Sequence, residues 1–81
     1  MNNQEIEQKV ADVFKEVIQA EHEHLKDDTH IFNDLGADSL DYVEIIVTVE
    51  KEFSIELPDE NVTEIVTYGD FLNLTKQIVN A

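Results

Sequence analysis

The chain has 81 residues, enough for one small domain, and a formal net charge of −14. Nineteen acidic residues face five lysines, and the sequence contains no arginine. Such a charge excludes nucleic acid and anionic membrane surfaces as partners, and it favours partners that present basic patches. The sequence also has no cysteine, so no disulfide stabilises the fold and any thiol chemistry requires an added group.

The beginning of the sequence predicts no targeting signal. Residues 1–5 contain neither a basic region nor an apolar one, which argues against a secretory or transit signal. No apolar run approaches the roughly 20 residues that a membrane-spanning helix needs. We therefore expect a monomeric cytoplasmic protein that does not bind membranes, with residues 1–81 forming a single domain.

The first predicted helix covers residues 3–20. Apolar side chains recur there every three or four residues and acidic side chains fall between them, which indicates one buried helix face. Asn3 is the expected N-terminal cap. A polar connection follows over residues 21–30, with Leu25 expected to anchor it in the core. Because this connection is long for a small domain, a short helical turn near residues 31–34 is favoured.

The second predicted helix covers residues 39–53, with Asp38 as its cap. It carries two apolar stripes, and one stripe is enough to pack a surface helix against a core. The first stripe consists of Tyr42, Ile45 or Ile46, Val49 and Phe53. The second consists of Leu40, Val43 and Val47. A central helix could bury both stripes, but the acidic residues around the second stripe favour a partly exposed docking surface.

The remaining sequence predicts one short helix and one longer helix. The short helix is expected over residues 59–65, after Pro58. Thr67 is expected to cap the last helix, with Asp70 three residues later as a capping-box partner and apolar residues over 71–79 facing inward. Short connections favour an up-and-down arrangement of the three longer helices. The predicted fold is all-α, a small four-helix bundle with three longer helices and one short helix.

Ser39 opens the second predicted helix, within the segment Gly36-Ala37-Asp38-Ser39-Leu40-Asp41. A serine hydroxyl in this place lies among unpaired backbone N–H groups, at the positive end of the helix dipole. Such a place favours a covalently attached phosphate group. A serine at a helix start is common by itself, so the interpretation depends on the surrounding sequence.

The segment around Ser39 resembles the prosthetic-group attachment motif of bacterial acyl carrier proteins. The similarity continues in four further segments, and it is supported by the length, the acidity and the order of the helices. These segments are Val43-Glu44, Glu50-Lys51-Glu52-Phe53, residues 55–60 and Thr67-Tyr68-Gly69-Asp70. Together with the motif they cover roughly residues 31–72, with consistent helix spacing over the rest of the chain.

The resemblance implies a carrier protein that is not an enzyme. It implies that a phosphopantetheinyl transferase (holo-carrier synthase) moves 4′-phosphopantetheine from coenzyme A to Ser39, beside Asp38 and Leu40, and that acyl chains are then held as thioesters. The implied partners are acyl-transferring, condensing and reducing enzymes with basic docking patches. The docking residues that the resemblance implies are Asp38, Leu40, Asp41, Val43, Glu44, Val47 and Glu50.

Some positions depart from the pattern of fatty-acid carriers. Val47 stands where the family usually has methionine, Tyr42 replaces a smaller polar residue, and Lys51 interrupts the acidic surface. These departures leave two pathways open. The chain either delivers acyl groups to fatty-acid biosynthesis or is a specialised carrier for a polyketide or another secondary lipid product.

The sequence offers three alternatives to a carrier: a serine hydrolase, a metal-binding loop and an unmodified acidic interaction module. A serine hydrolase is disfavoured because Ser39 lacks the Gly-x-Ser-x-Gly elbow. A zinc site built from His22, His24 and His30 is disfavoured against a solvated loop, because structural zinc sites commonly include cysteine. The loop acids also do not follow the calcium-loop pattern, so no metal site is predicted. An unmodified acidic interaction module is the third alternative.

Overall fold

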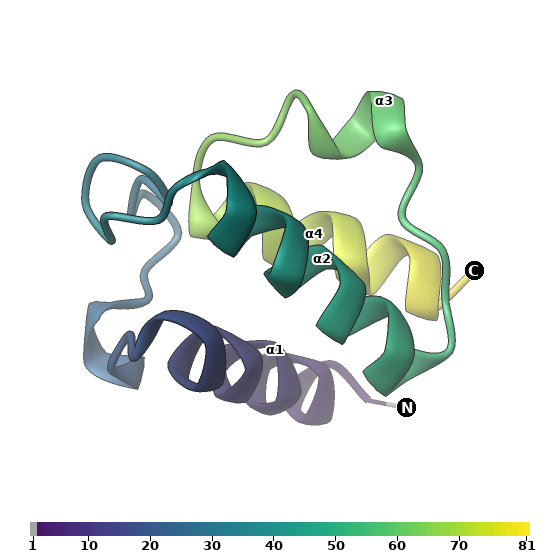
Figure 1. The fold of residues 1–81 in the computed structure, drawn as a ribbon. Helices are drawn as coiled ribbons and strands as arrows, with labels where there is room; N and C mark the ends of the chain where they lie inside the picture. The colour runs from purple at the N-terminus through teal and green to yellow at the C-terminus, as the bar shows by residue number, and fades with distance from the viewer. Residues whose placement is uncertain (1) are drawn as a thin grey trace.

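The computed structural model describes residues 2–81, which contain four α-helices and one short 3₁₀ helix joined by loops and turns (Figure 1). The helices are α1 (Asn3–Ile18), η1 (His22–His24), α2 (Ser39–Phe53), α3 (Asp59–Val62) and α4 (Tyr68–Val79). In Figure 1, α2 runs opposite to α1, α3 leads the chain back, and α4 runs in the direction of α2. The predicted all-α bundle of three longer helices and one short helix is confirmed. Among the three longer helices, α1 and α2 run in opposite directions, whereas α2 and α4 run in the same direction.

The bounds of α2 agree with the prediction, and those of the other helices differ at their ends. Asn2, not Asn3, caps α1, since its Oδ1 accepts the N–H of Glu5 at 2.8 Å. The same helix ends at residue 18 because Gln19 adopts a left-handed conformation, with φ of 57°. The short α3 ends at residue 62, and turns closed by i→i+3 hydrogen bonds then place Ile65 in the core.

The hydrophobic core lies where α1, α2 and α4 meet. Phe14 of α1 packs edge-on against Tyr68 and Phe71 of α4, with ring centroids 5.0 and 5.4 Å apart. Edge-to-face contacts of this kind add to the free energy gained by burying the rings. The largest fully buried side chains are Phe14, Phe71, Ile6, Ile31, Ile45, Val10, Val49 and Thr75.

Backbone hydrogen bonds hold the long connection between α1 and α2 against the start of α4. The N–H of Ile31 donates to the carbonyl of Val66 at 3.0 Å, and the N–H of Tyr68 donates to the carbonyl of Thr29 at 2.8 Å. An isolated antiparallel bridge forms between residues 30 and 67. Residues 31–34 form a hydrogen-bonded turn and not the expected helical one, and Leu25 packs on the core as expected.

Two ion pairs tie α1 to its neighbours. Lys9 Nζ lies 3.0 Å from Glu52 Oε1 of α2, and Lys76 Nζ of α4 lies 2.8 Å from Glu7 Oε2. Exposed pairs of this kind each contribute up to about 1 kcal/mol. They place two of the five lysines at helix–helix contacts, where the cations offset part of the repulsion between acidic residues.

We expect Gly69→Ala to destabilise the fold. A Cβ atom at this position would lie 2.6 Å from the carbonyl oxygen of Asp27, so the connection would have to move away from α4. The expected loss in the free energy of unfolding is about 1–3 kcal/mol, measured by urea denaturation. Asn73→Ala on the exposed side of the same helix is the control and should cost much less. Equal stability of Gly69→Ala and the parent chain would contradict the described contact.

The capping box of α4 should make stability depend on pH. Hydrogen bonds from Thr67, above all from its backbone N–H, hold the pKa of the Asp70 carboxyl below its ordinary value. A lowered pKa in the folded state stabilises the fold above the unfolded pKa of about 4, and this contribution is lost as the pH falls through the lowered value.

Asp70→Asn should therefore be less stable than the parent at neutral pH, and the difference should vanish in strong acid. Thermal unfolding from pH 7 to pH 2 measures this convergence. Glu16→Gln removes the same charge from an exposed position on α1, where the side chain accepts no backbone N–H, and serves as the control. A constant stability difference between Asp70→Asn and the parent at all pH values would contradict the role of the carboxylate.

Candidate functional site

A reciprocal capping box fixes the start of α2. Asp38 is extended, with φ of −102°, and its Oδ1 accepts the N–H of Asp41 at 2.9 Å. The Asp41 carboxylate returns the contact by accepting the N–H of Asp38 at 3.2 Å. The predicted capping role of Asp38 is confirmed. Asp41 was expected in the first turn because of its charge, but its return bond was not predicted, although a spacing of three residues can signal one.

A tight turn leads into this capping box. Gly36 has φ of 72°, a left-handed conformation that favours glycine. Its N–H donates to the carbonyl of Phe32 at 3.0 Å. The next residue, Ala37, is buried in the core, and its N–H faces the carbonyl of Ile31 at 3.4 Å. The turn thus anchors the chain two residues before Ser39.

Ser39 is the first residue of α2 and is exposed to solvent. The first N–H groups of a helix have no intrahelical acceptor. Asp38 satisfies the N–H groups of Asp41 and Tyr42. The N–H groups of Ser39 and Leu40 have no acceptor within residues 2–81. The site therefore combines an accessible hydroxyl with two free backbone donors and the positive end of a helix.

The second apolar stripe of α2 is exposed. Leu40 is 79% exposed, Val43 55% and Val47 41%, so the alternative in which this stripe lies in the core is wrong. Tyr42 and Val49 of the first stripe are buried, as predicted. Three apolar side chains thus extend from the start of α2 along its outer face. Adjacent exposed apolar side chains are typical of interaction sites.

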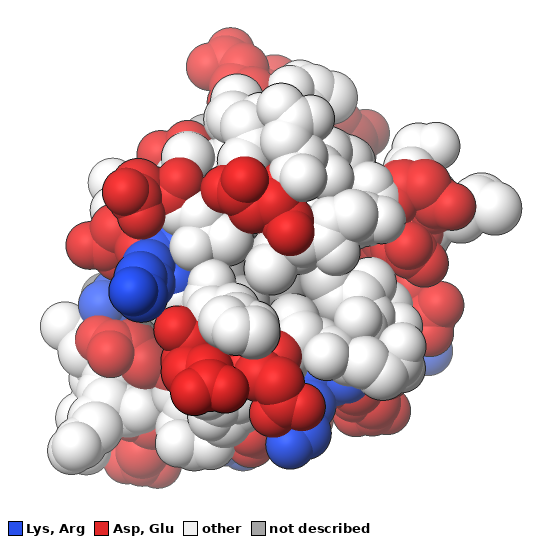
Figure 2. All heavy atoms as spheres, turned by 90° about the vertical axis from the view of Figure 1, so that its left-hand side faces the viewer, with Lys and Arg blue, Asp and Glu red and all other residues white. Residues whose placement is uncertain are grey.

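Acidic side chains accompany this apolar stripe. Asp38 and Glu44 are exposed, and Asp41 is half-buried because of its capping contact. Figure 2 views the side of the molecule that lies on the left in Figure 1, where α2 begins, and it shows acidic residues spread over that side with lysines toward its margins. The face therefore attracts cationic surfaces.

Glu50 differs from the other acids predicted for docking. It is half-buried, and its Oε2 accepts the N–H of Leu57 at 2.8 Å. Its backbone carbonyl accepts the N–H groups of Ser54 and Ile55 at the end of α2. The side chain therefore fixes the connection between α2 and α3. Sequence reasoning missed this contact, and no local pattern links a carboxylate to an amide seven residues away.

Tyr42 ties α2 to α3. Its hydroxyl donates to the carbonyl of Val62 at 2.7 Å, and its ring lies edge-on to Phe32 and Phe71. Burial raises the pKa of the Tyr42 hydroxyl to about 12, so the group is a donor at neutral pH. Tyr42, which departs from the usual pattern of fatty-acid carriers, therefore packs beneath the start of α2.

The three histidines lie in separate environments. His22 Nε2 is 3.2 Å from Asp12 Oδ1, and His30 Nδ1 accepts the N–H of Asn33 at 2.9 Å, while His24 is exposed. Among residues 2–81, no group of three histidine or acidic side chains is placed to hold a metal ion. The same part of the chain has no helix long and apolar enough to cross a membrane.

Comparisons with known proteins agree with the geometry around Ser39. A family model described as a phosphopantetheine attachment site matches residues 8–74, which include all of α2 and its capping box. The acyl carrier protein of Prochlorococcus marinus (strain MIT 9515) is 46% identical over 70 residues, which cover 86% of this chain and 88% of that protein. A match of this extent shows common descent along nearly the whole domain. The chain therefore belongs to the family of acyl carrier proteins, which carry a phosphopantetheine attachment site.

Proposed function

We propose that Ser39 carries the prosthetic group of this acyl carrier. The chain uses 4′-phosphopantetheine as its cofactor and carries acyl groups for biosynthetic enzymes, as a carrier rather than a catalyst. The observation that supports Ser39 is its position as an exposed first residue of α2, inside the matched attachment region. When bound, the arm supplies a thiol that holds an acyl group as a reactive thioester.

The residues present fit a phosphate group on the Ser39 hydroxyl. The free N–H groups of Ser39 and Leu40 can donate to phosphate oxygens, and the helix dipole favours negative charge there by up to about 1 kcal/mol. The Asp38 carboxylate is drawn toward Asp41, because it accepts that residue's N–H. The two acids therefore hold the helix start in shape while the hydroxyl stays accessible.

Attachment requires a separate enzyme. Within residues 2–81 no side chain forms a hydrogen bond with the Ser39 hydroxyl, so this part of the chain provides no general base for it. In the proposed reaction the serine oxygen bonds to the pantetheine-linked phosphorus of coenzyme A. The bond from that phosphorus to the bridging pyrophosphate oxygen breaks, and adenosine 3′,5′-bisphosphate leaves. The serine proton passes to a base on the phosphopantetheinyl transferase, which also supplies magnesium.

The outer face of α2 is the proposed docking surface for the transferase and for acyl-transferring, condensing and reducing enzymes. Its apolar stripe would bury against the partner, while the acids around it would meet basic side chains and speed association. The proposed docking residues are Asp38, Leu40, Asp41, Val43, Glu44, Val47 and Glu50. Glu50 contributes as a fixed charge, since one of its oxygens is engaged by Leu57.

The proposal extends to the setting in which the carrier acts. Residues 1–81 serve as one carrier domain, as a monomer, in the cytoplasm, and without enzymatic activity of their own. Delivery to fatty-acid biosynthesis is the first candidate pathway. A specialised polyketide or secondary lipid pathway is the alternative, because Tyr42, Val47 and Lys51 depart from the usual pattern of fatty-acid carriers.

Ser39→Ala should abolish loading and leave the helix content unchanged, because the side chain is exposed and makes no contact with the core. Intact mass after incubation with coenzyme A, magnesium and a broad-specificity phosphopantetheinyl transferase measures loading, and circular dichroism measures folding. Ser54→Gly is the control: it removes the other serine at a left-handed position that glycine tolerates, and it should load fully. A loaded alanine variant would refute the assignment.

Glu44→Lys should weaken docking to the transferase, because the side chain is exposed beside the apolar stripe. At low salt we expect kcat/KM for loading to fall about tenfold, equivalent to about 1.4 kcal/mol, with a weaker dependence on ionic strength. Glu16→Lys makes the same change of net charge on α1 and controls for the overall field. Identical salt profiles for the two variants would exclude a docking role for Glu44.

A further inference from the structure

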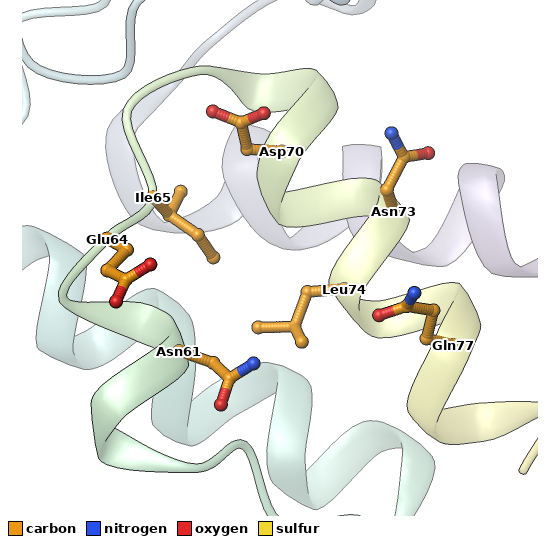
Figure 3. Close-up of a pocket in the computed structure, with 7 residues that line it drawn as sticks. All are labelled: Asn61, Glu64, Ile65, Asp70, Asn73, Leu74 and Gln77. Atoms are coloured by element: carbon orange, nitrogen blue, oxygen red, sulfur yellow. The ribbon is translucent and has the colours of Figure 1, made fainter.

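A cleft of about 210 Å³ lies between α3 and α4, outside the attachment site (Figure 3). Its floor is apolar, formed by the buried side chains of Ile65 and Leu74. Figure 3 shows Leu74 pointing into the space between the two helices, with polar side chains around it. The polar side chains of the rim are Asn61, Glu64, Asp70, Asn73 and Gln77.

The rim is rich in hydrogen-bonding groups that the fold does not use. Within residues 2–81, four of its side chains form no hydrogen bond, and they are exposed. These four are Asn61, Glu64, Asn73 and Gln77. The fifth, Asp70, uses one carboxylate oxygen to accept the N–H groups of Thr67 and Val66 and keeps the other free.

The composition of the rim selects the charge of an occupant. Each of the five rim side chains carries an oxygen that can accept a hydrogen bond, two of them are carboxylates, and no lysine or histidine lines the cleft. An anion is therefore repelled. A metal ion is also disfavoured, because no group of three metal-binding side chains forms within residues 2–81. An organic cation with several donors and an apolar stem satisfies both the rim and the floor.

We propose that the cleft between α3 and α4 binds the side chain of an arginine presented by a partner protein. The methylene stem of arginine can cover Ile65 and Leu74, and its planar head offers five N–H donors to the acceptors of the rim. Lysine has the same charge but only three donors around a single point, so it fits a wide ring of acceptors less well.

The cleft offers a second contact apart from the start of α2. In Figure 1, α3 lies on the far side of α2 from α1, and the cleft belongs to α3 and α4. A partner that holds the carrier through α2 gains from any additional weak contact, because the second binding event is then intramolecular. A weak arginine site can therefore alter the lifetime of a complex.

The first test uses a small arginine compound. The full-length ¹⁵N-labelled chain is titrated with Nα-acetyl-arginine amide, and with the citrulline counterpart, which has nearly the same shape and no charge. We expect saturable shifts of the side-chain amides of Asn61, Asn73 and Gln77 with arginine alone. Shifts that spread over the acidic surface without saturation, or equal shifts with citrulline, would overturn the proposal.

Matched variants separate binding in the cleft from general attraction to the negative charge of the protein. Glu64→Gln should raise the dissociation constant about threefold, within the range of a single exposed ion pair. Glu56→Gln removes the same charge from an exposed position outside the cleft and should leave the constant unchanged. Asn73→Lys places a cation in the rim and should abolish saturable binding. Equal effects of Glu64→Gln and Glu56→Gln would also overturn the proposal, and neither result bears on the loading of Ser39.

Discussion

The backbone pairing between the first connection and the start of α4 is the constraint on which the attachment site depends. Residues 29–31 exchange hydrogen bonds with residues 66–68, and Gly69 meets Asp27 closely enough to exclude a Cβ atom. The turn through Gly36 and the capping box of α2 both follow from where this pairing leaves the chain. The exposed residues at the start of α2 therefore depend on backbone hydrogen bonds between two other segments of the chain.

The charged residues also fall into two groups, one at the contacts between helices and one on the outer face of α2. Lysines at helix contacts pair with acids of neighbouring helices. Lys9 of α1 pairs with Glu52 of α2, and Lys76 of α4 pairs with Glu7 of α1. Among the described residues 2–81, the acids along the outer face of α2 have no lysine partner and make only capping and turn contacts. The fold thus uses Lys9 and Lys76 to stabilise helix contacts, and the acidic charge along α2 is available for recognition.

Much of this arrangement could be predicted from the sequence because its signals are local. The bounds of α2 follow from the Asp38 cap and the apolar period, and the exposure of Leu40 follows from its acidic surroundings. The contacts of Glu50 and Tyr42 could not be predicted, because they join residues 7 and 20 positions apart through the tertiary fold. The ends of α1 and α3 were predicted two or three residues too late, because the left-handed Gln19 ends α1 and i→i+3 hydrogen-bonded turns replace the helix after Val62.

The burial of Ala37 has a consequence for the shape of any enzyme that acts on this carrier. Because that residue is locked in the core two positions before Ser39, the serine cannot be drawn out on a flexible loop. Leu40 follows Ser39 directly, and its apolar side chain is exposed beside the serine. An enzyme must therefore receive the whole end of the helix, which requires a wide and shallow entrance with a hollow for the leucine. A deep and narrow active site could be reached only by a long, thin group attached to the serine.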